Sequence, residues 1–297
     1  MGLVDYSSSE EDDNEVSSRR SPAQMTAIEA LPSCPPPQSL PPLPRAFHDL
    51  YAATARTSLA DDPSLHQGRH RAIPHVTGQW PSHLYIEWFP SALEHALLAQ
   101  LLASLGDSLG QNAFHSLLTS DLGTPLPLHI SLSRPFVLTA ANKAGFLADL
   151  TTSIAASGVP QFTVTLKGLD WFRSPDSARA FLVMRVTLDD AHSSKQPLIT
   201  LLRRCNSLVT RAGQPALYAD SSSENVCDDN DAASAFHVSI AWTLTADLMA
   251  WSEATRQVYE TWKQANREEV MLRIPVKSIK AKIGNVVTDI PLSKARV

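Results

Sequence analysis

Two tetrads in this sequence each combine an imidazole with a hydroxyl. The first is His-Ile-Ser-Leu from position 129, and the second is His-Val-Ser-Ile from position 237. Successive side chains of a β-strand point to opposite faces of the sheet. On a strand, His129 and Ser131 therefore share one face, and His237 and Ser239 do the same. Each tetrad thus presents an imidazole beside a hydroxyl, while its apolar residues point to the other face, toward a core.

A single His-x-Ser triplet carries little information, because the chain has 10 histidines and is rich in serine. One such triplet begins at His192, follows Asp189 and Asp190 in a polar segment, and is interpreted as a coincidence. The two tetrads differ from it because both lie in apolar, strand-like segments, one in each half of the globular region. We therefore interpret His129 and His237 as a functional pair.

The chemistry that suits this pair is phosphodiester cleavage. Imidazole has an unperturbed pKa near ~6.5, so at neutral pH one histidine can act as a base and the other as an acid. A hydroxyl on the same face can donate to a non-bridging phosphoryl oxygen, a role expected of Ser131 and Ser239. Metal binding is the rival use of histidine, but no HExxH or CxxC spacing accompanies the tetrads. We expect catalysis by His129 and His237 without metal or cofactor, and the near-identical tetrads leave open which one is the base.

The elements that position the tetrads are expected to form an antiparallel α+β domain. The apolar patterns predict strands at 84–88, 128–133, 162–166, 181–188, 236–242, 276–283 and 286–290. They predict helices from a capping box at Ser91 to Gly106, and at 139–156, 197–212 and 246–270. Strict β-α-β alternation and a glycine-rich phosphate loop are absent, which argues against a doubly wound sheet. The order strand, helix, tetrad strand, helix recurs, which indicates two related lobes.

Composition divides the chain into a tail and a domain. Residues 1–70 are rich in proline, serine and acidic residues, so we expect a disordered tail before a domain at 71–297. Residues 220–234, rich in Ser, Asp and Asn, are interpreted as a loop insertion. The net charge of −5 excludes a strongly basic protein that grips long duplexes, but permits a pocket for a few nucleotides. The chain has three cysteines without CxxC spacing, which predicts a reducing compartment. It has no apolar run of ~18 residues, which predicts that it does not span a membrane.

Beyond the tetrads, the sequence resembles the U6 small nuclear RNA phosphodiesterases, a family of two-histidine (2H) phosphoesterases. The similar segments are Val4–Ser9, Arg69–Trp80, His83–Ile86, Leu128–Arg134 and Phe236–Trp242. The resemblance implies two pseudo-symmetric lobes of antiparallel sheet with outer helices and the site in the groove between them. It also implies a nuclear 3′–5′ exoribonuclease, active in U6 3′-end processing for mRNA splicing. Such an enzyme trims the oligouridine 3′ end of U6 RNA and leaves a 2′,3′-cyclic or simple terminal phosphate.

The same resemblance implies contacts with the single-stranded 3′ end of the RNA. The implied substrate-binding residues are Tyr218, Trp171, Phe172, Phe236, Val238 and Lys282. Tyr218, and either Trp171 or Phe172, match aromatic residues that stack terminal bases. This sequence departs from the family pattern because the 220–234 segment separates Tyr218 from His237. The expected partner is RNA alone, bound by a monomer.

Two other functions stay open. The same fold can act on a cyclic nucleotide or a 2′-5′ oligonucleotide, although the segments around the tetrads argue against both. The chain can also be a non-catalytic RNA-binding module. Two titratable groups, each with a hydroxyl beside it, argue against the module because binding alone does not need them. Incubation with a short oligouridine separates the possibilities: an enzyme shortens it, and a module only retains it.

Overall fold

The computed structural model describes residues 76–110, 113–174, 178–188, 196–218, 234–244, 247–266 and 272–294. All of these belong to one compact unit that spans Tyr51–Val297. The predicted tail at 1–70 lies outside the described residues, and so does the predicted insertion at 220–234 apart from its last residue. In the described part of the chain, no helix is long and apolar enough to cross a membrane.

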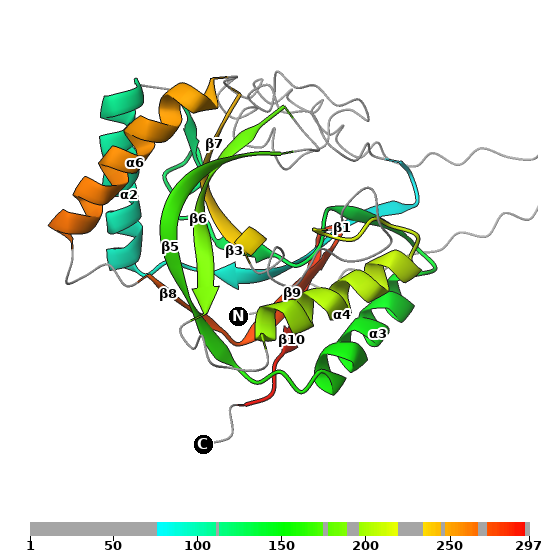
Figure 1. The fold of residues 1–297 in the computed structure, drawn as a ribbon. Helices are drawn as coiled ribbons and strands as arrows, with labels where there is room; N and C mark the ends of the chain where they lie inside the picture. Colours follow the sequence, from blue (N-terminus) through cyan, green and yellow to red (C-terminus); the bar gives the residue numbers. More distant parts are fainter. Residues whose placement is uncertain are drawn as a thin grey trace, which may run out of the picture. The chain divides into compact units, whose positions relative to one another are not determined.

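The described strands form a ten-stranded antiparallel sheet, which confirms the antiparallel α+β class (Figure 1). Its main path runs β10-β9-β1-β3-β7-β6-β5-β8, and β2 pairs with β7 while β4 pairs with β1. The strands are β1 (Gln79–Trp88), β2 (His115–Ser116), β3 (Leu128–Ser131), β4 (Phe136–Thr139), β5 (Phe162–Arg173), β6 (Ala180–Leu188), β7 (His237–Thr243), β8 (Arg273–Val276), β9 (Ser278–Ile283) and β10 (Val286–Pro291).

The two tetrad strands, β3 and β7, are neighbours at the centre of this sheet. From that centre one half continues through β1, β9 and β10, and the other through β6, β5 and β8. The two halves share one kind of connection, in which a helix leads from an outer strand to the tetrad strand. Helix α2 (Ala92–Leu109) lies between β1 and β3 in the chain, and α4 (Pro197–Arg211) lies between β6 and β7. The halves are joined in one sheet by the pairing of Ile130 with Val238, rather than forming two separate sheets.

The helices pack in two pairs, and each pair takes one helix from each half of the sheet. Helix α2 packs on α6 (Leu248–Ala265), and α3 (Lys143–Ala156) packs on α4 (Figure 1). Helix α2 begins at the predicted capping box, in which the Ser91 hydroxyl accepts from the Glu94 N–H and the Glu94 carboxylate accepts from the Ser91 N–H. A buried hydrogen bond from the Trp262 indole to the Leu97 carbonyl, 3.1 Å long, joins α6 to α2.

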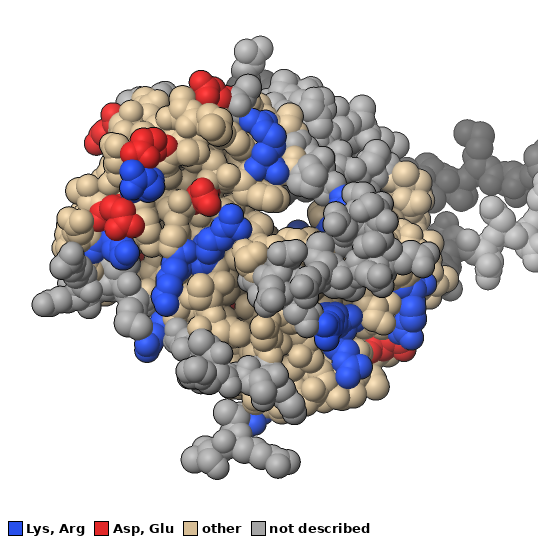
Figure 2. All heavy atoms as spheres, viewed as in Figure 1, with Lys and Arg blue, Asp and Glu red and all other residues tan. Residues whose placement is uncertain are grey.

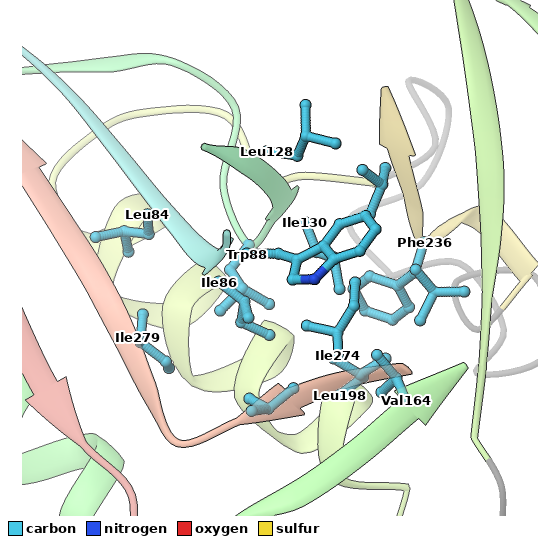
Figure 3. Close-up of a cluster of buried hydrophobic side chains, with 14 of the residues drawn as sticks. Leu84, Ile86, Trp88, Leu128, Ile130, Val164, Leu198, Phe236, Ile274 and Ile279 are labelled. Atoms are coloured by element: carbon cyan, nitrogen blue, oxygen red, sulfur yellow. The ribbon is translucent and has the colours of Figure 1, made fainter. Parts of the chain in front are cut away.

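The apolar residues of the tetrads are anchored in the core on one face of the central strands. Figure 3 shows Ile130 and Phe236 packed with Trp88 of β1, Leu198 of α4 and Ile274 of β8. Each large apolar side chain buried in this way contributes roughly 1.5–3 kcal/mol to stability. Because side chains alternate along a strand, this packing turns the tetrad histidines and serines to the opposite face.

Several predicted boundaries differ from the structure, among them the start of β1 at 79 rather than 84 and the end of α6 at 265 rather than 270. Strand β5 extends well beyond 166, to Arg173, through a bulge between Lys167 and Asp170. The helix predicted from 139 begins only at Lys143, because β4 occupies the preceding residues. Gly106 does not end α2 but lies inside it, and the helix ends at Gly110, where a φ of 107° favours glycine.

Candidate active site

The antiparallel register of β3 and β7 brings the two tetrads together. Ile130 lies opposite Val238, and both side chains are fully buried on the core face. One residue further along each strand, His129 therefore lies opposite Ser239 and Ser131 lies opposite His237. The four polar side chains thus lie at the corners of a quadrilateral on the other face of the sheet, with each imidazole opposite a hydroxyl. We call these four residues the tetrad site.

The His237 ring is oriented by the residue two positions before it. Its Nδ1 lies 2.7 Å from the carbonyl oxygen of Ala235. A carbonyl only accepts hydrogen bonds, so in the neutral ring Nδ1 carries the hydrogen and Nε2 keeps a free lone pair. Burial lowers the pKa of His237, and the nearby positive charge of Arg185 lowers it further, while the Ala235 carbonyl opposes both effects. These influences favour a neutral His237 whose Nε2 can accept a proton.

His129 lies in a different setting. Its side chain is exposed, yet protein surrounds the ring closely enough for desolvation to lower its pKa to about 4. Charge on His237 lowers this pKa as well, so a proton on one ring disfavours a proton on the other. Both rings are therefore mostly neutral near pH 7 in the free protein. A negative phosphate bound beside them favours protonation of one ring, which suits a reaction in which one ring accepts a proton and the other donates one.

Strand β1 adds two residues to this face that the sequence analysis did not assign to the site. Tyr85 lies opposite Ser131, and its ring is 5.5 Å from that of His129. His83 Nε2 lies 3.2 Å from the Ser131 Oγ, and the His83 ring meets the His129 ring edge-on at 5.4 Å. The period-two pattern of β1 puts both side chains on one face, but only the pairing of β1 with β3 places that face beside the tetrads.

Charged residues flank the tetrad site on both sides. Lys282 of β9 lies opposite His83, and on the other side Arg185 of β6 lies opposite His237. Arg185 donates to the Ser234 carbonyl at 3.0 Å and pairs with Asp170 at 3.4 Å. Over the described part of the face in Figure 2, lysines and arginines form separate groups with acidic residues among them. Near the histidines, Lys282 and Arg185 bring positive charge from two strands, which suits a few phosphates rather than a long duplex.

The structure separates the two aromatic candidates on β5. The Phe172 ring lies 5.4 Å from the His237 ring and is 38% exposed, so it can contact a ligand beside the histidine. Trp171 points to the helix side instead, where its indole donates to the Thr255 hydroxyl at 2.9 Å and its ring packs against Trp251. The structure therefore brings Phe172, and not Trp171, to the tetrad site.

Tyr218 lies next to the second tetrad strand despite the long segment between them. Its hydroxyl donates to the Ala235 carbonyl at 3.1 Å, so Tyr218 and His237 share one acceptor. Its ring packs edge-on against Phe236, and burial raises its pKa. The ends of the predicted insertion are thus held together at Ala235.

Two of the predicted substrate contacts are core residues. The side chains of Phe236 and Val238 are 1% and 0% exposed. Both point to the core face, because they alternate with His237 along the chain. These side chains fix the position of β7, so a contact of Phe236 or Val238 with the substrate has to be made by the main chain. Metal ligation was not expected, and among the described residues no group of three or more His, Cys, Asp or Glu side chains is placed to hold a metal ion.

The lowered pKa values predict a loss of stability in acid. His83 and His129 have pKa values of about 3 and about 4 in the folded protein, below the ordinary 6.5. As the pH falls below 6.5, the unfolded chain binds protons that the folded chain excludes. Between pH 7.5 and 5.5 we expect His83 to remove about 1 kcal/mol of stability, and His129 less because its ring meets solvent. Urea unfolding at both pH values measures this loss, and the His83→Gln variant is expected to lose less.

Comparison with known proteins places the chain in a family. It matches the HVSL family model, described as "Uncharacterised conserved protein", over residues 41–291. It is 39% identical over 292 residues to U6 snRNA phosphodiesterase 1 of Neurospora crassa, covering 88% of this chain and 78% of that protein. It is 24% identical over 292 residues to the Homo sapiens protein of the same name, covering 98% of both.

A solved structure supports the same placement at the level of the fold. The structure of Kluyveromyces marxianus Usb1 with uridine monophosphate superposes with a TM-score of 0.50 at 18% identity. The superposition covers 71% of this chain and 98% of that one. The family model and the relatives span most of the sequence, including both tetrads, and the chain therefore belongs to the U6 snRNA phosphodiesterase 1 family.

Proposed function

We propose that this protein is a metal-independent 3′–5′ exoribonuclease that trims the oligouridine 3′ end of U6 snRNA in the nucleus. The observation that carries the proposal is the tetrad site, in which two histidines and two serines meet on adjacent central strands. Membership in the U6 snRNA phosphodiesterase 1 family supports the substrate. The single-stranded 3′ end of the RNA is the partner, and the nuclear location follows from the substrate.

Hydrogen bonding supports one assignment of the two histidines. His237 donates through Nδ1 to the Ala235 carbonyl, so its Nε2 is free to remove the proton from the ribose 2′-OH. The 2′ oxygen then attacks the phosphorus, and the bond from phosphorus to the 5′ oxygen of the departing nucleotide breaks. His129, which becomes protonated when the negative phosphate is bound beside it, gives its proton to that 5′ oxygen. The shortened RNA ends in a 2′,3′-cyclic phosphate, which the same pair can open with water.

The surrounding side chains suit the remaining needs of the reaction. Ser239, opposite His129, can donate to a non-bridging phosphoryl oxygen as negative charge grows on it. Phe172 beside His237 offers an exposed ring on which a base can stack. Lys282 and Arg185 supply positive charge on either side for the neighbouring phosphates. In this proposal the RNA lies across the face where the two halves of the sheet meet.

A direct test uses a short oligouridine with a labelled 5′ end. The expected result is a ladder of products shortened from the 3′ end. Binding without shortening identifies a non-catalytic module instead. Faster turnover of a 2′,3′-cyclic nucleotide or a 2′-5′ oligonucleotide than of oligouridine identifies another 2H substrate. In either case the proposed function is wrong.

Chelation is expected to leave the activity unchanged. Both proton transfers are assigned to imidazoles, and Arg185 and Lys282 supply positive charge near the phosphate, so no step depends on a metal ion. The measurement is the initial rate on oligouridine with and without about 10 mM EDTA. Loss of activity in EDTA that Mg²⁺, Mn²⁺ or Zn²⁺ restores contradicts the mechanism.

The catalytic domain is proposed to begin near residue 71. Deletion of residues 1–65 is expected to leave kcat on oligouridine within about twofold of the full chain, because that segment lacks the apolar pattern of a core. A thermal melt checks that the truncated chain folds. A folded but inactive truncation shows that the tail completes the site.

A further inference from the structure

Each histidine of the tetrad site has an aromatic ring beside it, and the two rings come from opposite halves of the sheet. The Phe172 ring of β5 lies 5.4 Å from the His237 ring, and the Tyr85 ring of β1 lies 5.5 Å from the His129 ring. Phe172 is exposed and Tyr85 is half-buried, so both rings reach the surface. Phe172 offers its ring to a base in the proposed function, whereas Tyr85 has no part in it.

A cation accompanies each of these rings. On one side, Arg185 of β6 lies opposite His237. On the other side, Lys282 of β9 lies opposite His83, whose ring stacks on that of Tyr85 at 5.3 Å. Residues directly opposite each other in an antiparallel sheet point to the same face, so Lys282 shares the face of Tyr85. A ring for a base and a cation for a phosphate are the contacts with which proteins hold single-stranded RNA.

The polar groups of Tyr85 and Lys282 are not used within the part of the chain that the structure describes. There, neither the Tyr85 hydroxyl nor the Lys282 ammonium makes a hydrogen bond or an ion pair with another residue. Lys280, two residues before Lys282 on the same strand, differs, because it pairs with Glu87 at 3.6 Å and with Asp289 at 3.2 Å. The two carboxylates thus hold Lys280, and the charge of Lys282 remains for a ligand.

We propose that Tyr85 and Lys282 form a second nucleotide subsite, which holds the nucleotide on the far side of the scissile phosphate from the one that Phe172 contacts. The proposal rests on the proposed function, because it concerns the same substrate. A phosphodiester joins two nucleosides, and the tetrad site has one ring and one cation on either side. Tyr85 contacts the base or the ribose through its ring and through a hydroxyl that can donate or accept. Lys282 attracts the adjoining phosphate.

The test measures binding rather than rate, because Tyr85 also packs against His129, and its loss can lower the rate without any contact with RNA. The ligand is an oligouridine with a 2′-deoxy sugar at the penultimate position, which the proposed mechanism leaves uncut. Tyr85→Ala is expected to raise its Kd about 10- to 100-fold. Tyr85→Phe removes only the hydroxyl and is expected to raise Kd less, about three- to tenfold.

A matched control removes a hydroxyl elsewhere. Tyr259→Phe loses a hydroxyl of α6 that accepts from the Gly168 N–H at 2.9 Å, and it is expected to leave Kd unchanged. Melting temperatures check the fold of every variant. A Kd that does not change in Tyr85→Ala overturns the proposal.

The salt dependence of binding tests the charge of Lys282. Lys282→Met is expected to weaken binding and to reduce the slope of log Kd against log salt concentration by about 0.7, the share of one phosphate contact on a single strand. Lys277→Met removes another exposed lysine, just before β9, and is expected to leave the slope unchanged. Equal slopes for wild-type protein and Lys282→Met refute the contact with phosphate.

Base removal distinguishes a subsite from a general loss of affinity. Two versions of the uncut oligomer each lack one base, at the terminal or at the penultimate position. In wild-type protein, loss of the base beside Tyr85 is expected to raise Kd about tenfold. In Tyr85→Ala the same loss is expected to have less than about threefold effect, because the partner is already gone, while the other base remains important. If Tyr85→Ala stays as sensitive as wild-type protein to both losses, the subsite is wrong.

These measurements separate the subsite from the proposed function. If wild-type protein fails to shorten an all-ribose oligouridine while the Tyr85 and Lys282 variants weaken binding as expected, the proposed function is wrong and the subsite stands. If wild-type protein shortens oligouridine while Kd depends on neither residue, the proposed function stands and the subsite is wrong.

Discussion

Replacing either His129 or His237 with alanine is expected to lower kcat on oligouridine by about 10³-fold or more. Each imidazole carries one of the two proton transfers, so removing either ring leaves one transfer without its group. The fold is expected to survive, because His129 is exposed and His237 is half-buried, while the core anchors of both strands stay in place. Single-turnover rates and thermal melts measure the two effects separately.

The double variant, in which both His129 and His237 are replaced with alanine, tests whether the two rings act together. Acid and base act as a unit, so the loss of both rings is expected to be little worse than the loss of one. A matched control is His115→Ala, which removes an exposed histidine that stacks on Trp242 at the far end of β7. This control is expected to keep most of the activity. Near-wild-type turnover in either tetrad variant contradicts the assignment of the pair.

The alternation of side chains explains why the tetrads could be predicted from sequence. In each tetrad, apolar residues alternate with polar ones, and that pattern alone places the imidazole and the hydroxyl on one face. Ile130 and Val238 are buried as this pattern requires. The boundaries of α4 and β6 also follow from local signals, since Pro197 suits a first helical turn and an apolar run fills β6. These features need only residues close in the chain.

Features that depend on pairing between distant strands were not predictable in the same way. His83 lies next to Ser131 only because β1 pairs with β3, and Arg185 lies next to His237 only because β6 pairs with β7. The sequence carries no local signal for either register. The choice between Trp171 and Phe172 shows the same limit, because the bulge in β5 decides which ring faces the histidines.

The direction in which the side chains near His237 point also could not be predicted from the sequence alone. Phe236 and Val238 flank His237 in the sequence, and the family resemblance implied substrate binding for both. The sheet turns their side chains to the other face, into the core. Tyr218 is the opposite case, since it is distant from His237 in the chain yet shares the Ala235 carbonyl with it.

An oligouridine with a single 2′-deoxy sugar at the penultimate position is expected to bind and remain uncut. The mechanism assigns both proton transfers to imidazoles and activates no water on a metal ion. The nucleophile nearest to the scissile phosphorus is then the 2′-OH of the ribose on its 5′ side. Its attack is intramolecular, so a held geometry gives it an effective molarity of about 10⁵ M or more over a free hydroxyl. Removal of this one oxygen therefore removes the nucleophile while leaving every base and phosphate in place.

The experiment compares the cleavage rate and the Kd of the deoxy oligomer with those of an oligomer whose single 2′-deoxy sugar lies four positions upstream. The upstream change keeps the same number of hydroxyls but leaves the attacking one, so this control is expected to be trimmed normally until the modified sugar is reached. Equal cleavage of both oligomers means that water attacks the phosphorus directly. His237 then activates water, since its free Nε2 suits either nucleophile. The selectivity for RNA in that case comes from recognition of the sugar hydroxyls and not from the chemical step.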